Sequence, residues 1–247
     1  PIFKSLSLLA IPIMATYFIQ MAYNLVDMLW IGFLGSGAVA SIGVSGNFMY
    51  LANGLVNIPK IGSQALVGQS LGANNKAETK NYIESAFQSS IFFALIYGVI
   101  IIVFQKNLIQ LFNLSDPIII QDAQNYLWIT CGFIVFSFVN QIFTGILTAA
   151  GHSKSTFIAT TTGLVLNLIL DPVLIFVFDL RVIGAALATI LAQIIVTLVF
   201  LYDARNLDLF RDIHILSKPE LNHISKILKI GFPSSVQSML FTCISMY

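Results

Sequence analysis

The sequence predicts an all-α protein, a bundle of helices that crosses a lipid bilayer several times. Of its 247 residues, 57% are hydrophobic and only 9% are charged, whereas a soluble domain carries roughly 25% charged residues. The apolar residues fall into repeated stretches of the roughly 20 residues that a helix needs to cross the hydrocarbon layer. Helices are expected because lipid offers backbone N–H and C=O groups no hydrogen-bond partner.

Apolar runs separated by polar breaks predict six membrane spans, and a seventh begins near Leu221. In chain order the predicted spans are Leu6–Leu34, Val39–Leu71, Tyr82–Phe112, Pro117–Ala150, Lys154–Phe178 and Val182–Tyr202. Several exceed the minimum length, which favours helices that tilt or extend beyond the bilayer. The one long connection, residues 203–220, is predicted to be a linker between two lobes.

Positive charges predict how the spans are oriented. With a cytoplasmic N-terminus, the inner side collects Lys4, Lys76, Lys80, Lys154, Arg205, Arg211, Lys218, Lys226 and Lys229. The outer loops then hold only Lys106 and Arg181. Because cytoplasmic loops carry the excess of Lys and Arg, we expect the N-terminus to be cytoplasmic and the protein to lie in the cell membrane.

Two acids inside the spans are the main functional candidates, because a carboxylate in a membrane is costly. Asp27 in the first span and Asp171 in the fifth fall at similar depth, in the outer half, so we expect them to share one pocket. Each has polar neighbours three or four residues away on its own helix face. Asn24 is three residues before Asp27, Gln20 continues the same stripe four residues earlier, and Asn167 is four residues before Asp171.

Other spans also carry polar stripes at helical spacing. The stripes are Asn140, Thr144 and Thr148 in the fourth span and Thr189, Gln193 and Thr197 in the sixth, with Tyr126 near the outer end of the fourth. Such groups favour a polar cavity inside the lobe. For the amides alone, hydrogen bonding between helices is the favoured interpretation; for two carboxylates at one depth, a functional site is favoured.

Lys60 lies too deep in the second span to reach the inner surface easily. Two interpretations stay open: a counter-charge to an acid, or a residue at the wall of an inner cavity. Pro172 frees a backbone carbonyl beside Asp171, and here a kink that moves the acid and a static bend stay equally open. The glycine-rich segments from Gly62 to Ala73 and from Gly184 to Thr189 are expected to let helices approach closely.

No cofactor or metal motif is visible. Cys131 and Cys243 fall inside apolar stretches and are expected to be core residues, and the three histidines are not clustered. The glycine-rich segments lack the Lys-Ser or Lys-Thr pair of a phosphate loop. We therefore expect no cofactor and no nucleic-acid partner.

A short internal similarity bears on the domain organisation. Ser5-Leu-Ser-Leu-Leu-Ala-Ile-Pro12 aligns with Lys226-Ile-Leu-Lys-Ile-Gly-Phe-Pro233, as expected if a second copy of the lobe starts there. The chain begins with Pro1 and stops at Tyr247 within an apolar run, so part of a longer protein is expected. The predicted domains are an N-terminal six-helix lobe (1–202), a cytoplasmic linker (203–220) and the start of a C-terminal lobe (221–247).

Four segments together form a specific pattern. They are Asp27-Met-Leu-Trp-Ile-Gly-Phe-Leu-Gly35, Leu66-Val-Gly-Gln-Ser-Leu-Gly-Ala73, Asn167-Leu-Ile-Leu-Asp-Pro172 and Gly184-Ala-Ala-Leu-Ala-Thr-Ile-Leu-Ala-Gln193. In these segments, and through all six spans into the seventh, the sequence resembles the multidrug and toxic compound extrusion (MATE) family.

The resemblance implies a twelve-helix antiporter of two six-helix lobes that exports organic, often cationic, compounds in exchange for protons or sodium. It implies a coupling-ion site at Asp27, Asn167 and Asp171, with Tyr126 and Asn140 as neighbours. Cavity-lining roles are expected for Gln20, Asn24, Thr189, Gln193 and Lys60. The second lobe, which the present chain lacks, would be needed for transport.

The identity of the coupling ion stays open. Burial and a second nearby carboxylate both favour the protonated form of an acid, so the pair is suited to hold and release a proton. Two carboxylates with an Asn carbonyl also make an oxygen-rich site suited to a hard cation such as sodium, at Asp27, Asn167 and Asp171. Proton coupling is preferred because titration needs no further ligands.

Three alternatives to export are compatible with parts of this pattern. A flippase of lipid-linked saccharides would share the helical architecture, but a more basic cavity is expected for pyrophosphate than Lys60 alone provides. An intramembrane enzyme with Asp27 and Asp171 as a catalytic dyad is disfavoured, because no familiar catalytic motif surrounds the acids. An isolated half that performs no transport by itself is the third, since alternating access needs two lobes.

Overall fold

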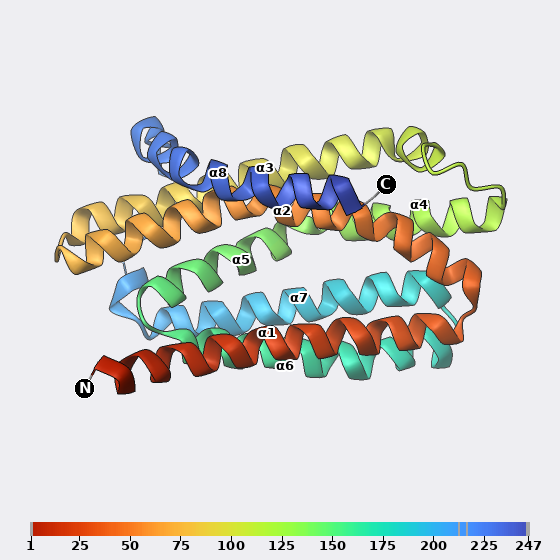
Figure 1. The fold of residues 1–247 in the computed structure, drawn as a ribbon, viewed down its shortest axis with the longest axis horizontal. Helices are drawn as coiled ribbons and strands as arrows, with labels where there is room; N and C mark the ends of the chain where they lie inside the picture. Colours follow the sequence, from red (N-terminus) through yellow and green to blue (C-terminus); the bar gives the residue numbers. More distant parts are fainter. Residues whose placement is uncertain (1, 212, 216, 246–247) are drawn as a thin grey trace.

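The computed structural model describes residues 2–211, 213–215 and 217–245, and it is helical almost throughout (Figure 1). Side chains are described from residue 11 to residue 240, except at positions 12, 13, 16, 212, 216, 238 and 239. The helices are α1 (Ile2–Phe33), α2 (Ser36–Gly72), α3 (Lys76–Gln110), α4 (Pro117–Gly132), α5 (Ile134–Ala149), α6 (Ser153–Pro172), α7 (Arg181–Arg205) and α8 (Leu221–Ser245). A π-helical turn, η1 (Val173–Val177), continues α6, and a 3-10 turn, η2 (Asp208–Phe210), follows α7.

The predicted all-α membrane fold is confirmed, with one correction. Four of the described helices, α2, α3, α6 with its π turn, and α7, are long and apolar enough to cross a membrane. The predicted fourth span, 117–150, is divided into two helices, α4 and α5, inclined by 50°; counted as one broken span, the pair raises the number of spans among the described helices to five. α1 matches the first predicted span in position, although its first side chains lie outside the described residues.

The bend between α4 and α5 lies beside a close contact with α3. The backbone of Cys131 lies so close to Gly98 of α3 that a Cβ at Gly98 would be 2.8 Å from the Cys131 carbonyl oxygen. Phe133 follows with a backbone that is no longer helical. Cys131 itself is buried, as predicted, whereas the side chain of Cys243 lies outside the described residues.

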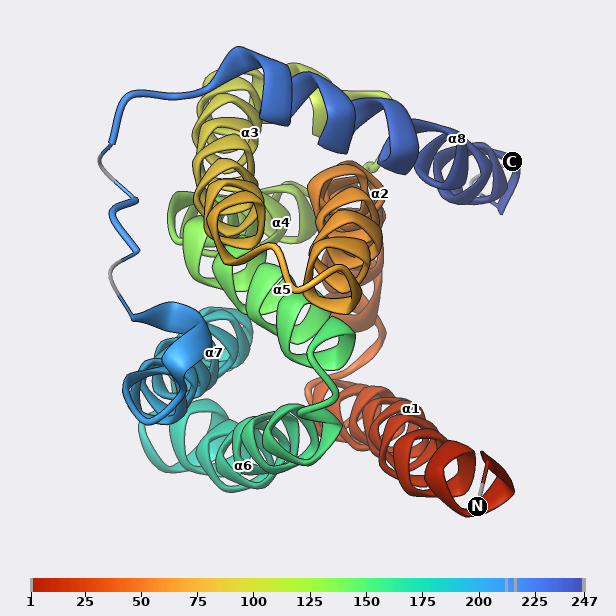
Figure 2. The ribbon, with the colours of Figure 1, turned by 90° about the vertical axis from the view of Figure 1, so that its left-hand side faces the viewer.

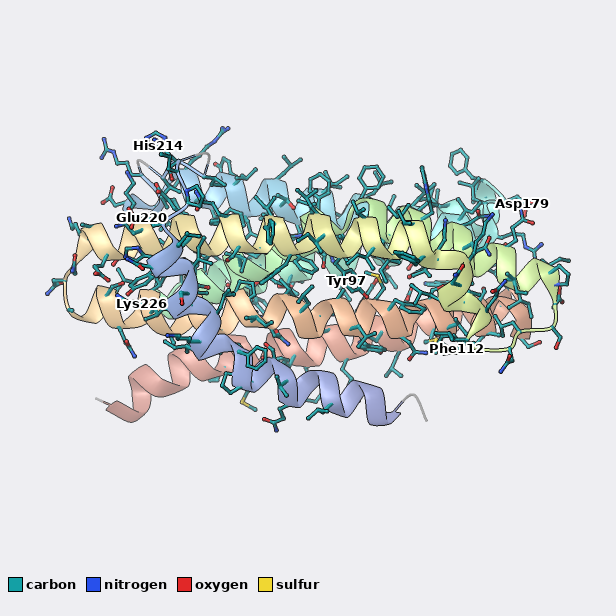
Figure 3. All side chains as sticks on the ribbon, turned by 90° about the horizontal axis from the view of Figure 1, so that it is seen from above. Tyr97, Phe112, Asp179, His214, Glu220 and Lys226 are labelled. Atoms are coloured by element: carbon teal, nitrogen blue, oxygen red, sulfur yellow. The ribbon has the colours of Figure 1, made fainter. Side chains whose placement is uncertain are left out.

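The connections alternate between the two ends of the bundle. Phe112 and Asp179, in the turns after α3 and α6, lie at one end, whereas His214, Glu220 and Lys226 lie at the other (Figure 3). The turn between α2 and α3 shares the end of the linker residues (Figure 1). The positive-rich connections therefore gather at one end, as the charge pattern requires of a single membrane orientation.

Seen end-on, the helices form two groups joined by α5 (Figure 2). α2, α3 and α8 lie on one side, and α1, α6 and α7 on the other. Aromatic rings from three helices form the centre of the core: Phe143 of α5 stacks on Phe200 of α7 at 5.3 Å and meets Phe87 of α3 edge-on at 4.8 Å. This packing fixes α5 between the two groups.

The linker between α7 and α8 is held against α3 by two side chains. Glu84 accepts hydrogen bonds from the backbone N–H of His214 (2.8 Å) and from the hydroxyl of Ser217 (3.0 Å). Gln88, one turn further along α3, donates to the carbonyl oxygens of Ile215 (3.0 Å) and Ser217 (2.9 Å). The segment is therefore anchored to the lobe at several points.

α8 crosses α2 at unusually close range through two glycines. A Cβ at Gly62 of α2 would overlap the carbonyl oxygen of Ile227, and a Cβ at Gly231 of α8 would overlap that of Ile58. On each helix, the glycine comes four residues after the carbonyl group that meets the other helix's glycine. The pairs are Ile58 and Gly62 on α2 and Ile227 and Gly231 on α8. The predicted use of Gly62 for close helix approach is confirmed, and so is that of Gly184, which lies against the backbone of Leu174.

Candidate functional site

Asp27 and Asp171, far apart in the sequence, lie beside each other in the structure. α1 packs along α6, and the two carboxyl groups lie close enough to interact electrostatically. Asp171 is 1% exposed and Asp27 is partly buried. Oδ1 of each acid is buried and has no hydrogen-bond partner among the described residues. Such atoms are costly unless a proton or a cation satisfies them.

Two phenols and a threonine surround the acids. Tyr23 lies one turn before Asp27 on α1, and Tyr126 comes from α4. Both phenol groups interact electrostatically with both carboxyl groups, and the side chain of Thr189 on α7 lies close to both phenols. The site is therefore assembled from four helices, α1, α4, α6 and α7.

Asn167 joins the acid pair to the backbone of α7. With its amide oriented so that donors face acceptors, the nitrogen lies 2.6 Å from Asp171 Oδ2 and the oxygen lies 3.1 Å from the backbone nitrogen of Thr189. Asn167 is 2% exposed. Both ends of the amide are thus engaged, and the donation to Asp171 stabilises the charged form of that carboxyl group.

Small residues on α6 permit this contact with α7. Gly163, Asn167 and Asp171 follow one another at intervals of four and so share a helix face. A Cβ at Gly163 would overlap a methyl group of Val196 on α7. The absence of that Cβ lets the two helices approach until Asn167 reaches the α7 backbone.

α6 ends at Pro172, and the π turn Val173–Val177 follows it directly without a sharp break. In this turn the N–H of Phe178 bonds to the carbonyl oxygen of Val173 at 3.0 Å. Single π turns within α-helices occur frequently at functional sites. The helical winding is therefore altered immediately beside Asp171.

Asn140, which the sequence groups with the acids, lies in a separate polar network. Its amide nitrogen donates to the backbone oxygen (2.9 Å) and side-chain oxygen (2.7 Å) of Gln193, and its oxygen accepts from the hydroxyl of Thr197 at 2.8 Å. This network ties α5 to α7. Gln193 lies one turn beyond Thr189, so the two polar sites are adjacent along α7.

The remaining candidates are spread over two other surfaces. Gln20 and Asn24 are exposed on α1 and are not buried with the acid pair. Lys60 of α2 donates to Oε1 of Gln141 on α5 at 2.6 Å. Among the described residues, no carboxylate lies within 4.0 Å of the Lys60 ammonium, so it is not a counter-charge to either acid in this arrangement.

Sequence reasoning missed Tyr23 and Glu84. Tyr23 carried a usable signal, because a position four residues before an intramembrane acid shares its helix face. Glu84 carried none: its partners, His214 and Ser217, come from a linker whose path no local pattern specifies.

The site's chemistry suits reversible binding of a small cation. Two carboxyl groups in contact favour one shared proton, since two charges so close together in a buried place are unfavourable. The described residues contain no group of three or more His, Cys, Asp or Glu side chains that could hold a metal ion. Oxygen donors are available from the two carboxyl groups, but the Asn167 oxygen is already engaged by α7.

Comparison with known proteins places this arrangement in context. A family model named MatE matches residues 12–173. Curated relatives include the multidrug export protein MepA of Staphylococcus aureus, 27% identical over 245 residues, and MepA of Staphylococcus saprophyticus, 29% identical over 254 residues. In both cases the alignment covers 97% of this chain and 53% of the relative. The chain therefore spans about half the length of these relatives.

Solved structures agree with the fold. An outward-facing multidrug resistance transporter of the MOP superfamily superposes with a TM-score of 0.87 at 24% identity, over 96% of this chain and 52% of that one. A MOP superfamily transporter from Pyrococcus furiosus, described as having a binding pocket of reverse polarity, gives 0.83 at 26% identity over the same shares. Both match this chain with about half of their own length.

Proposed function

The chain belongs to the MATE family, and on that basis we propose that it forms the N-terminal half of a cation-coupled antiporter that exports organic compounds by alternating access. In this proposal residues 1–202 are the first lobe, 203–220 the cytoplasmic linker, and 221–247 the start of the second lobe. The N-terminus is cytoplasmic and the protein lies in the cell membrane. Transport requires the second lobe.

One observation carries the proposal: Asp27 and Asp171 meet inside the bundle, and each has an unsatisfied buried oxygen. A shared proton would satisfy one of these oxygens and remove one charge. Hydration of the cavity or arrival of an organic cation would favour release of that proton. Asn167 then stabilises the charged Asp171 through its amide donor.

A proton is preferred to sodium as the coupling ion. The Asn167 oxygen, which would be a sodium ligand, faces the backbone nitrogen of Thr189 instead. Sodium would therefore have to draw its oxygen ligands from the two acids and nearby hydroxyl groups. Binding a proton requires no such rearrangement.

The flippase alternative receives no separate support. The curated relatives are named multidrug export proteins, and Lys60 is a single basic group paired with a neutral amide. We therefore propose export and do not propose a flippase function.

The test is efflux of a fluorescent organic cation from energised vesicles that contain the full-length transporter. Asp27→Asn and Asp171→Asn each remove a titratable group while keeping the side-chain shape. We expect both to reduce gradient-driven efflux by more than about tenfold, because neither variant can cycle a proton through the pair. A proton gradient, rather than a sodium gradient, should drive the wild type.

Asp122→Asn is the matched control. Asp122 lies on α4, as Tyr126 does, and has no ion pair within 4.0 Å among the described residues. Its substitution should leave efflux within about twofold of wild type, because Asp122 is outside the acid pair and has no ion-pair partner to lose among the described residues. Unchanged efflux in Asp27→Asn and Asp171→Asn, with both proteins folded and inserted, would show that the acid pair is structural.

A further inference from the structure

Lys60 is an ammonium group within a membrane span that has a neutral partner and no acid. Its Nζ donates to Gln141 Oε1 at 2.6 Å, and no described carboxylate lies within 4.0 Å. An ammonium has three donor hydrogens, and the contact with Gln141 engages one of them. Because an intramembrane charge is costly, a lysine kept without a counter-ion is expected to serve a ligand.

The lysine is held in place from two sides. Gly145 of α5 leaves room for it: a Cβ at that position would lie 3.2 Å from both Lys60 Cγ and the Lys60 carbonyl oxygen. On the opposite face of α2, Ile58 and Gly62 pack against α8. The side chain is therefore directed to α5, and rotation of α2 is opposed by the contact with α8.

Polar residues continue from Lys60 along both helices. On α2 they are Asn53, Asn57 and Gln64, at intervals of three or four residues, and all are at least partly exposed. On α5, Ser137, Gln141 and Thr144 follow at the same intervals and are also partly exposed. Equal spacing on two packed helices produces a polar strip with one positive charge at its centre.

The acid pair lies elsewhere. Asp27 and Asp171 belong to the group formed by α1, α6 and α7, whereas Lys60 lies on α2 beside α5 (Figure 2). α5 separates the two environments, since Asn140 bonds to α7 and the next residue, Gln141, bonds to α2. One lobe thus carries an anionic site and a cationic site with distinct walls.

We propose that Lys60, positioned by Gln141, is a specificity-determining residue whose ammonium group binds the carboxylate of those exported compounds that carry one. The proposal rests on the export function proposed above. The ammonium supplies a point charge and two donors to a carboxylate, and the flanking Asn57 and Gln64 amides supply further hydrogen bonds. The substrate then supplies the counter-ion that the described residues do not provide.

The test compares two dyes that differ in one group: a rhodamine methyl ester, which is a cation, and the same rhodamine with its carboxylate free. Full-length transporter in energised vesicles is assayed for efflux, and the purified protein is assayed for binding by fluorescence anisotropy. Lys60→Met keeps an unbranched side chain, one heavy atom shorter, and removes the charge. It should weaken binding and raise KM about tenfold for the free-carboxylate dye only.

Two control variants define the effect. Lys60→Arg keeps the charge and should retain most of the affinity for the carboxylate. Lys229→Met removes an exposed charge from Ile-Leu-Lys-Ile-Gly, a sequence nearly identical to the Ile-Pro-Lys-Ile-Gly around Lys60. This variant should bind and export both dyes as wild type does.

The proposal would be overturned if Lys60→Met weakened binding and efflux of both dyes equally, or of neither dye. Repeating the assay with and without anionic phosphatidylglycerol separates another source of oxyanions: if the variant differs from wild type only when that lipid is present, Lys60 binds lipid phosphate and not the substrate. If wild type exports neither dye, the export function fails, while the anisotropy measurement still decides whether Lys60 binds the carboxylate.

Discussion

At the scale of single residues, the acid pair and Asn140 separate into two roles that the sequence had combined. Asp27 and Asp171 are left with buried, unpaired oxygens, whereas both ends of the Asn140 amide have partners on α7. Unpaired groups can change partner during a cycle, and paired ones hold helices together. We therefore propose ion binding for the acids and helix attachment for Asn140.

This division predicts different behaviour in Asn140→Ala and Asp171→Asn. Asn140→Ala leaves Gln193 and Thr197 without their partner and should lower the free energy of unfolding by about 1–2 kcal/mol. The dependence of efflux on the proton gradient should persist. Thermal unfolding in detergent measures the first effect, and efflux at graded proton gradients measures the second; loss of gradient dependence would return Asn140 to the ion site.

The two glycines at the crossing of α2 and α8 give a second prediction. Gly231→Ala or Gly62→Ala should destabilise the protein by about 1–3 kcal/mol, because the added methyl group overlaps a backbone oxygen that cannot move alone. Unfolding of the purified full-length protein by heat or denaturant measures the change.

Gly43→Ala is the control for the glycines. Gly43 lies in α2, as Gly62 does, but a Cβ there would meet nothing within 4 Å. Since alanine favours helices over glycine, this variant should be as stable as wild type or more stable by up to about 1 kcal/mol. A similar loss in Gly43→Ala and Gly62→Ala would mean that the close crossing does not contribute.

At the scale of helices, the linker is the element whose behaviour is easiest to test. Glu84→Ala removes the acceptor for the N–H of His214 and the hydroxyl of Ser217. Hydrogen exchange of the backbone amides around these residues should become at least about tenfold faster, which corresponds to roughly 1.4 kcal/mol of lost protection.

Asp208→Asn tests whether any loss of charge near the linker has the same result. The Asp208 side chain is 99% exposed and makes one 3.8 Å ion pair with Arg211. Exchange around His214 should match wild type in this variant. Fast exchange in Asp208→Asn, or unchanged exchange in Glu84→Ala, would show that Glu84 does not anchor the linker.

The positions of the helices were predictable because a membrane span requires a long local run of apolar residues, which is visible in the sequence. Apolar runs of sufficient length leave a chain in lipid few options besides a helix. The meeting of Asp27 and Asp171 was also predictable, since two costly groups at one depth favour a common location. Depth along a helix follows directly from residue number.

Features that depend on contact between distant helices were not predictable. The 50° change of direction between α4 and α5 lies beside their close contact with Gly98 of α3, and the sequence alone suggested one continuous span. Proline at 172 indicated a disturbance but not the π turn that comes after it. The separation of Asn140 from the acids likewise depends on which face of α5 meets α7.

At the scale of the whole molecule, membrane orientation is the property that every functional assignment assumes. Single cysteines at Lys154, beside the turn between α5 and α6, and at Ser115, between α3 and α4, lie at opposite ends of the bundle and are exposed. We expect an impermeant maleimide added to intact cells to label Ser115→Cys but not Lys154→Cys. The measurement is made in a background with Cys131 and Cys243 replaced by serine.

Permeabilised cells provide the control, because both positions should then be labelled equally. If only Lys154→Cys is labelled in intact cells, the orientation is the reverse of the predicted one. The acid pair would then lie in the half of the membrane nearer the cytoplasm.

The glycine crossing also has a consequence for biosynthesis. Ribosomes deliver α2 to the membrane long before α8, yet Gly62 of α2 receives its backbone partner only from Ile227. During that interval the face of α2 around Ile58 and Gly62 lacks its native partner and is open to lipid or to the insertion machinery. The bundle of α1–α7 therefore reaches its final packing only after α8 has been made, so the insertion of α8 is a late step in its maturation.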